Sequence, residues 1–199
     1  MRVSRLVLGC LTLTALLNSY AMAADMPEQM NTPAFTPKDQ SAPNIISELR
    51  FGGAAHDPSS SEKGSVDING EVLFAKAFHS DNPLIEFFIP RLHIGGSINT
   101  AGKTSYGYAG FTWTYDITKE IFVEASLGAA IHNGDTGDNV KKHHNALGCN
   151  TLFREALGLG YRIDEHWSVM ATVDHMSNAG FCSQNRGLTN VGAKIGYTF

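Results

Sequence analysis

Apolar and polar residues alternate along most of this chain, which is typical of β-strands with two different faces. The clearest stretch carries apolar side chains at Ile121, Val123, Ala125, Leu127, Ala129 and Ile131. The pattern predicts eight strands over 45–56, 65–78, 89–99, 106–117, 121–133, 151–163, 167–180 and 188–199. Most of them have the length of tilted strands that cross a bilayer, about 9 to 11 residues. We therefore expect an all-β chain that forms an eight-stranded antiparallel barrel.

The second face of these strands is polar and rich in charge. It carries Glu48, Arg50, Asp67, Asn69, Glu71, Arg91, His93, Thr112, Thr114, Asp116, Glu124, Ser126, His132, Arg154, Arg162, Asp174 and Lys194. A soluble, lipocalin-like barrel would turn this face to water. A membrane barrel would instead turn it to the lumen, where opposite charges pair across the interior. The period of two fits both barrels, so other features must separate them.

The beginning of the chain favours export. Residues 1–23 read as a secretory signal, with two arginines, an apolar run over Leu6–Leu17 and a small-residue cleavage site at Ala21–Ala23. Residues 24–44 contain four prolines and are expected to be a flexible lead-in. This leaves residues 45–199 as one barrel domain.

The end of the chain favours the membrane barrel. The last predicted strand alternates and finishes with Tyr197 and Phe199, which resembles the assembly signal of bacterial outer-membrane barrels. That resemblance implies recognition by the barrel-assembly machinery. The segments 57–64, 134–150 and 181–187 are long and polar, as external loops of such barrels are. We therefore expect a multi-pass protein of the bacterial outer membrane.

Charge and cysteine content limit the partners. The formal net charge is −4, and no basic stripe of the kind that nucleic acids require is present in the sequence. Cys149 and Cys182 remain after removal of the signal, both at the predicted external end. The sequence leaves open whether they form a disulfide. Their spacing does not match a metal site, so neither a metal nor another cofactor is expected.

Candidate chemistry lies on the seventh predicted strand. Its apolar face ends in His175 and Ser177, which point the same way because they are two residues apart. A histidine near neutral pH can take the proton of a serine hydroxyl and make it a nucleophile. Asn178 and the backbone amides around Ala179 and Gly180 can donate hydrogen bonds to the oxyanion of an ester hydrolysis. Spacing alone also fits two ordinary polar residues at a strand end.

A longer motif changes this balance. His175-x-Ser177-Asn178-Ala179-Gly180, followed by Asn185-x-Gly187, resembles the lipid A 3-O-deacylases of the PagL family. The resemblance implies an eight-stranded outer-membrane enzyme that hydrolyses the acyl ester at the 3 position of lipid A without a metal. It implies a catalytic His175 and Ser177, and family positions at Asn178, Asn185 and Phe153.

One position departs from the family. The family's acid stands two residues after the loop glycine, where this chain has Thr189. A threonine can orient an imidazole but cannot neutralise its positive charge. Glu155 is the candidate replacement, because a tight turn at 164–166 would place it opposite His175 on the neighbouring strand. A register shifted by one residue would instead send it to the lumen.

These residues predict a lipid A ester hydrolase that acts on lipopolysaccharide in the outer leaflet. The alternative is a non-catalytic structural or adhesin-like outer-membrane barrel, for which Thr189 is the best argument. A soluble carrier comes third. The sequence leaves open which acyl chain is removed, whether the activity is latent and whether the protein forms a homodimer.

Overall fold

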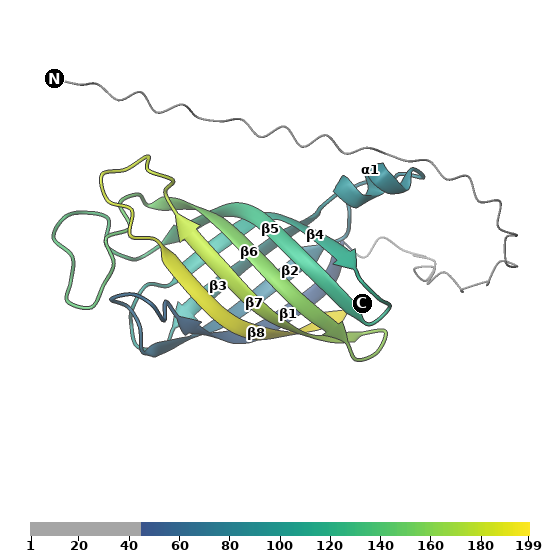
Figure 1. Cartoon of the computed structure of the whole chain (residues 1–199), viewed down its shortest axis with the longest axis horizontal. Coiled ribbons are helices and arrows are strands. Elements are labelled where there is room, and N and C mark those ends of the chain that lie inside the picture. The colour runs from purple at the N-terminus through teal and green to yellow at the C-terminus, as the bar shows by residue number, and fades with distance from the viewer. Residues whose placement is uncertain (1–44) are drawn as a thin grey trace, which may run out of the picture. The chain divides into compact units, whose positions relative to one another are not determined.

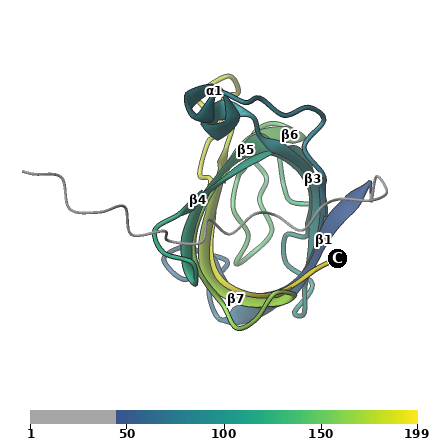
Figure 2. The same ribbon diagram turned by 90° about the vertical axis from the view of Figure 1, so that its right-hand side faces the viewer.

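The computed structural model describes residues 45–199, so the predicted signal at 1–23 and the lead-in at 24–44 lie outside the described residues. The described chain forms a closed barrel in which each strand pairs antiparallel with its neighbours in sequence and the last pairs with the first (Figures 1 and 2). The strands are β1 (Ile46–His56), β2 (Ser65–Phe74), β3 (Arg91–Asn99), β4 (Tyr106–Asp116), β5 (Ile121–His132), β6 (Thr151–Arg162), β7 (Trp167–Ser177) and β8 (Leu188–Thr198). The predicted eight-stranded barrel is confirmed.

The outer surface of the barrel is apolar. Large hydrophobic side chains from every strand are exposed, among them Phe51, Ile68, Ile98, Phe111, Leu127, Ile131, Leu157, Leu159, Val173, Val191 and Ile195. A water-soluble carrier would bury these side chains, because each exposed apolar group costs free energy in water. The arrangement is that of a barrel surrounded by hydrocarbon, and it contradicts the lipocalin-like alternative.

The lumen is filled by paired charges, as predicted. Arg50 lies between three carboxylates, with its Nη1 2.6 Å from Glu124 Oε2 and 3.2 Å from Glu71 Oε1, and its Nε 2.7 Å from Glu48 Oε1. Lys194 places its Nζ 3.0 Å from Glu71 Oε2. Arg50 and Glu124 come from β1 and β5, which are opposite in the ring of strands. These ion pairs therefore tie opposite walls together through the interior.

The second strand ends earlier than the alternation predicts. The strand expected over 65–78 stops at Phe74, and the chain then forms a short helix, α1 (Pro83–Phe88), outside the ring of strands (Figure 2). Asn82 starts this helix, since its side chain accepts a hydrogen bond from the Leu84 N–H at 3.0 Å, and a proline follows it. The helix was not predicted because its short apolar run has no strand-like or helix-like period. No helix within residues 45–199 is long and apolar enough to cross a membrane.

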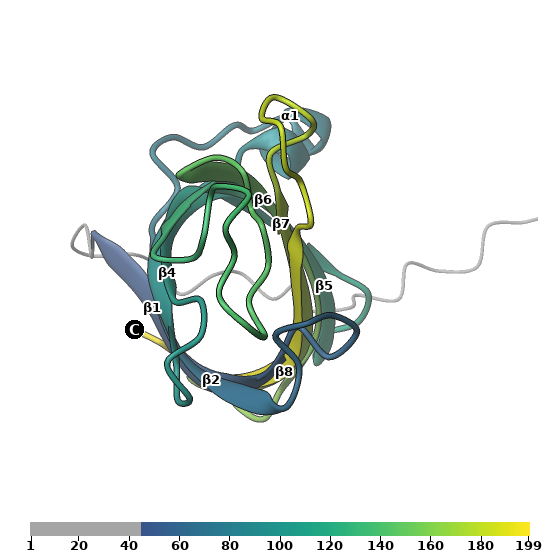
Figure 3. The ribbon, with the colours of Figure 1, turned by 90° about the vertical axis from the view of Figure 1, so that its left-hand side faces the viewer.

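Long loops gather at the end of the barrel opposite α1 (Figure 1). Viewed from that end, the connection between β5 and β6 folds across the opening (Figure 3). Its residues Asn145 and Leu147 are almost fully buried. A disulfide joins Cys149 to Cys182, with 5.8 Å between the Cα atoms, and so ties this loop to the β7–β8 loop. The loop end is thus closed and cross-linked.

A buried carboxylate fastens the loops to the barrel wall. Glu62 accepts hydrogen bonds from the Thr104 N–H at 3.0 Å and the Asn145 N–H at 2.8 Å, and its Oε2 lies 2.8 Å from Nε2 of His56. Burial opposes the ionisation of this carboxyl, but the hydrogen bonds from His56, Thr104 and Asn145 outweigh it and lower the pKa of Glu62 to about 2. Glu62 is therefore an ionised anchor for three segments.

Candidate active site

A row of polar side chains crosses three strands on the outer face near the loop end. Glu155 on β6 pairs with His175 on β7, and His175 pairs with Thr189 on β8. The prediction that Glu155 lies opposite His175 is confirmed, because the tight turn before Trp167 sets the register that the sequence implies. All three side chains share the face that carries the apolar belt, so the row faces the bilayer side of the wall.

His175 is held on one side by Thr189. Its Nδ1 lies 2.7 Å from Oγ1 of Thr189, and the ring is half-buried. Gly187, with a φ of 70°, lies against the edge of the same ring, and a Cβ atom there would approach His175 Cε1 to 3.0 Å. A larger residue at this position would push the ring away from its place. The hydrogen bond and the glycine together fix the plane of the imidazole and leave Nε2 for other partners.

Ser177 is the last residue of β7 and shares the outer face with His175. It is half-buried and pairs across the ladder with Phe153 of β6. Within residues 45–199 its hydroxyl makes no hydrogen bond, to His175 or to any other group. Catalytic hydrogen bonds are often long without substrate and tighten when it binds. The two side chains therefore stand side by side at the end of the strand without being locked together.

The chain turns sharply after Ser177. Ala179 and Gly180 have φ values of 52° and 84°, and the Phe181 N–H donates to the Asn178 carbonyl at 3.0 Å. Two positive φ values in succession are the signature of a type I′ turn. The predicted strand over 167–180 thus ends three residues early. Gly180 serves here as a turn residue.

The side chain of Asn178 builds this loop. Its Nδ2 donates to the carbonyls of Leu147 and Gln184, and its Oδ1 accepts a hydrogen bond from the Gly180 N–H at 2.9 Å. Its backbone N–H donates to Asn185 Oδ1 at 2.9 Å. Both asparagines that the family resemblance singles out therefore hold the loop in place. The Nδ2 of the Asn178 carboxamide thus already has two acceptors within the loop.

Glu155 lies on the side of His175 away from Thr189. It is exposed on the outer face, and within residues 45–199 its carboxylate has no hydrogen-bond partner. An unpaired carboxylate on a lipid-facing surface is costly and is expected only where it has a use.

Two aromatic rings make an apolar edge beside Ser177. Phe153 and Phe181 lie with their ring centroids 6.0 Å apart. Phe181 is 80% exposed, the largest exposed fraction among the large hydrophobic side chains of residues 45–199. Phe181 was not predicted from the sequence, because its only signal is a phenylalanine inside a polar loop. The disulfide at the neighbouring Cys182 holds it next to β6.

Asp57, which follows the end of β1, was not predicted from the sequence either. Continuing the β1–β8 register by two residues from Ala55 and Val191 places Asp57 beside Thr189. Its Oδ1 accepts a hydrogen bond from the Thr189 N–H at 3.2 Å. Asp57 and Thr189 are 132 residues apart in sequence, so no local pattern could have indicated this contact.

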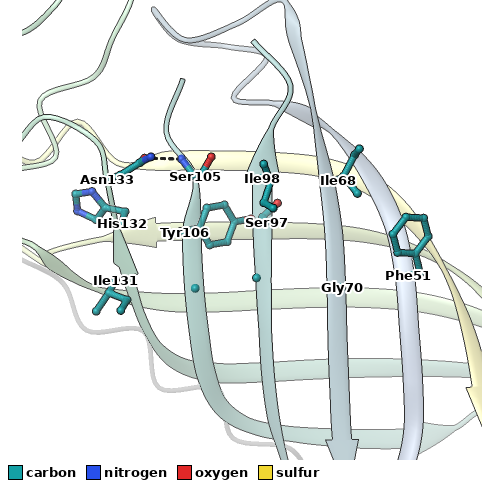
Figure 4. Close-up of a pocket in the computed structure, with 12 residues that line it drawn as sticks. Phe51, Ile68, Gly70, Ser97, Ile98, Ser105, Tyr106, Ile131, His132 and Asn133 are labelled. Carbon is teal, nitrogen blue, oxygen red and sulfur yellow. Dashed lines mark hydrogen bonds between the residues drawn. The ribbon is translucent and has the colours of Figure 1, made fainter. Parts of the chain in front are cut away.

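A further groove lies elsewhere on the barrel. It has a volume of about 670 Å³ and is lined by residues of β1 to β5, including Phe51, Ile68, Ile98 and Ile131 (Figure 4). At its outer end the Ser105 N–H donates to Asn133 Oδ1 at 2.8 Å. β3, at the middle of this wall, is opposite β7 in the ring of strands. The groove is therefore separate from His175. Within residues 45–199 no three His, Cys, Asp or Glu side chains are grouped as metal ligands.

Comparison with known proteins agrees with the motif. Residues 88–198, more than half of the chain, match the protein-family model for lipid A 3-O-deacylase (PagL). The crystal structure of the outer membrane enzyme PagL superposes with a TM-score of 0.60 at 16% identity, over 77% of this chain and 100% of that one. A de novo designed transmembrane β-barrel superposes with a TM-score of 0.50 at 14% identity, over 78% of this chain and 96% of the design. No curated protein matches the chain in sequence. The chain therefore belongs to the lipid A 3-O-deacylase (PagL) family of outer-membrane β-barrels.

Proposed function

We propose that this protein hydrolyses the ester that links an acyl chain to the 3 position of lipid A, with Ser177 as the nucleophile. The observation that carries the proposal is the outer-face row at the loop end of the barrel, where His175 is oriented by Thr189 and stands beside Ser177. The substrate is the lipid that surrounds this wall in the outer leaflet. A reacting ester would therefore reach the serine from the membrane.

The proton path follows from the hydrogen bond to Thr189. With the Nδ1–H of His175 donated to Thr189 Oγ1, the lone pair on Nε2 is free to take a proton. As Ser177 Oγ attacks the acyl carbonyl, its proton passes to Nε2. When the tetrahedral intermediate collapses, His175 returns that proton to the departing 3-hydroxyl oxygen of the sugar. Water, activated by the same Nε2, then hydrolyses the acyl-serine and releases the fatty acid.

Two further groups support the reaction. The Ala179 N–H lies two residues after the nucleophile and has no hydrogen-bond partner within residues 45–199, so it can donate to the oxyanion. Glu155, on the side of His175 away from Thr189, places negative charge beside the imidazolium that forms. Thr189 orients the ring and Glu155 stabilises its charge, and together they replace the single acid of the family.

The apolar edge formed by Phe153 and Phe181 supports the choice of substrate. These rings extend the hydrocarbon belt up to Ser177. An acyl chain can therefore lie along Phe153 while its ester reaches the serine. This contact keeps the chain out of water, which favours binding through the hydrophobic effect.

The two ends of the chain carry the signals for export and for assembly in the membrane. We propose that residues 1–23 are removed on export, that residues 24–44 remain as a lead-in to the barrel, and that the strand ending at Phe199 is recognised by the barrel-assembly machinery.

The test is mass spectrometry of lipid A from cells that express the wild type or Ser177→Ala. We expect one ester-linked acyl chain to be lost with the wild type and retained with Ser177→Ala. Heat-modifiable gel mobility establishes that both barrels are folded. Unchanged lipid A with a folded wild-type barrel would overturn the proposal and leave the structural or adhesin-like barrel as the better description.

A further inference from the structure

Asp57 is a buried carboxylate directly behind the histidine's partner. It is 4% exposed, and its Oδ1 accepts the Thr189 N–H at 3.2 Å, while Oγ1 of that same threonine lies 2.7 Å from Nδ1 of His175. Asp57 thus places a second carboxylate beside the row, on the side of His175 opposite to Glu155. Only one residue separates it from the imidazole.

The position of Asp57 is over-determined by its surroundings. Its Oδ2 accepts hydrogen bonds from Asn145 Nδ2 and Ser60 Oγ, and its own N–H donates to Asn190 Oδ1 at 3.0 Å. Its φ is 39°, a left-handed conformation that costs free energy for a residue with a side chain. A strained and buried carboxylate persists only where several contacts hold it. Here the contacts hold Asp57 against Thr189 and Asn190 at the start of β8.

Other charged groups lie close to this carboxylate. His56 precedes it in sequence, and Glu62 is linked to it through Ser60 and Asn145. Glu62 is already engaged with His56, Thr104 and Asn145. Of the two carboxylates Asp57 and Glu62, Asp57 is therefore the one that contacts the row, through the Thr189 N–H.

We propose that Asp57 is a positioning residue for the reaction, which acts through Thr189. Its hydrogen bond to the Thr189 N–H fixes the backbone from which the hydroxyl reaches His175. Its negative charge, in a buried and weakly screened place, favours the imidazolium that forms when Ser177 loses its proton. This chain thereby recovers, from a loop of β1, part of the charge that the family's acid supplies from β8. The inference rests on the proposed deacylase activity.

The experiment compares Asp57→Asn with Ser60→Ala in the purified full-length barrel in lipid A-containing micelles. Asp57→Asn removes the charge and keeps the shape, whereas Ser60→Ala removes one contact to the carboxylate and keeps the charge. We expect Asp57→Asn to lower kcat by about tenfold, because the imidazolium loses a neighbouring negative charge, with little change in KM. The acidic limb of its pH–rate profile should move to lower pH. Ser60→Ala should keep the wild-type profile.

A second background separates positioning from mere stability. Thr189→Glu places an acid directly on the histidine, so Asp57→Asn should then change kcat by less than about twofold. An equal loss in both backgrounds, or an unshifted acidic limb, would overturn the role of Asp57. The titration of the His175 ring followed by NMR, whose midpoint should fall in Asp57→Asn, needs no activity. The NMR titration therefore still tests the coupling between Asp57 and His175 if no ester is hydrolysed. Absence of hydrolysis would contradict the proposed function and not the role of Asp57.

Discussion

The imidazole of His175 and the hydroxyl of Thr189 meet across the β7–β8 ladder, with Nδ1 and Oγ1 2.7 Å apart. A threonine thus stands in contact with the histidine, at the position where the resemblance to the family predicts an acid. The contact orients the ring and leaves Nε2 without this partner. A threonine hydroxyl can both donate and accept a hydrogen bond, so it supplies orientation without supplying charge.

Removal of the Thr189 hydroxyl should therefore impair the chemical step. We expect Thr189→Val, which keeps the shape of the side chain, to lower kcat by at least about tenfold, since the imidazole loses the hydrogen bond that orients it. Thr198→Val, at the other end of β8, is the matched control and should leave kcat unchanged. Steady-state kinetics on purified lipid A measures both. A Thr189→Val enzyme with wild-type kcat would show that this hydrogen bond is dispensable.

Glu155 should contribute through its charge. We expect Glu155→Gln to lower kcat by about tenfold, because the imidazolium loses a neighbouring negative charge in a poorly screened place. Glu165→Gln, which changes an exposed carboxylate in the turn between β6 and β7, serves as the control. High salt should not reproduce the effect of Glu155→Gln. Equal kcat values for the two variants would assign the support of His175 to Thr189 and Asp57 alone.

Phe181 should affect binding more than chemistry. Replacement by alanine removes an exposed ring that packs on Phe153 beside Ser177, so an acyl chain loses apolar contact. We expect KM to rise by about tenfold, equivalent to roughly 1.4 kcal/mol, with kcat within about twofold of wild type. Phe78→Ala, an exposed phenylalanine before α1, should change neither constant. A fall in kcat without a change in KM would contradict this role.

Glu62 should make the loop end sensitive to acid. Its pKa is lowered from an ordinary value of 4.5 to about 2, so the folded state binds this proton less readily than the unfolded state. The sign follows: the stabilisation is complete above pH 4.5 and is lost progressively as the pH falls toward 2. A shift of this size corresponds to a contribution on the order of 3 kcal/mol.

The measurement is the melting temperature of the barrel as a function of pH. Between about pH 7 and about pH 3, Glu62→Gln should lose less stability than the wild type, while Glu120→Gln, changed in an exposed turn, should follow the wild type. Parallel curves for Glu62→Gln and the wild type would refute the assignment.

The sequence by itself determined the barrel and the position of the row on its wall. Alternation with a period of two is a local property, so it separates the lumen charges such as Arg50 and Glu71 from the outer apolar belt. The register that places Glu155 opposite His175 also follows locally, because a tight turn couples two adjacent strands. The helix α1 and the early ends of β2 and β7 were missed, since turn and capping contacts overrule the alternation there.

Only the tertiary structure decided what surrounds the row. Closure of the barrel brings β1 beside β8, so Asp57 reaches Thr189 across 132 residues of sequence. The folding of the long loops then pairs Cys149 with Cys182 and sets Phe181 against Phe153. Loop conformations depend on contacts with distant segments, and no pattern along the chain encodes those contacts. The strands could therefore be predicted from the chain alone, whereas the groups that support the histidine required the closed barrel.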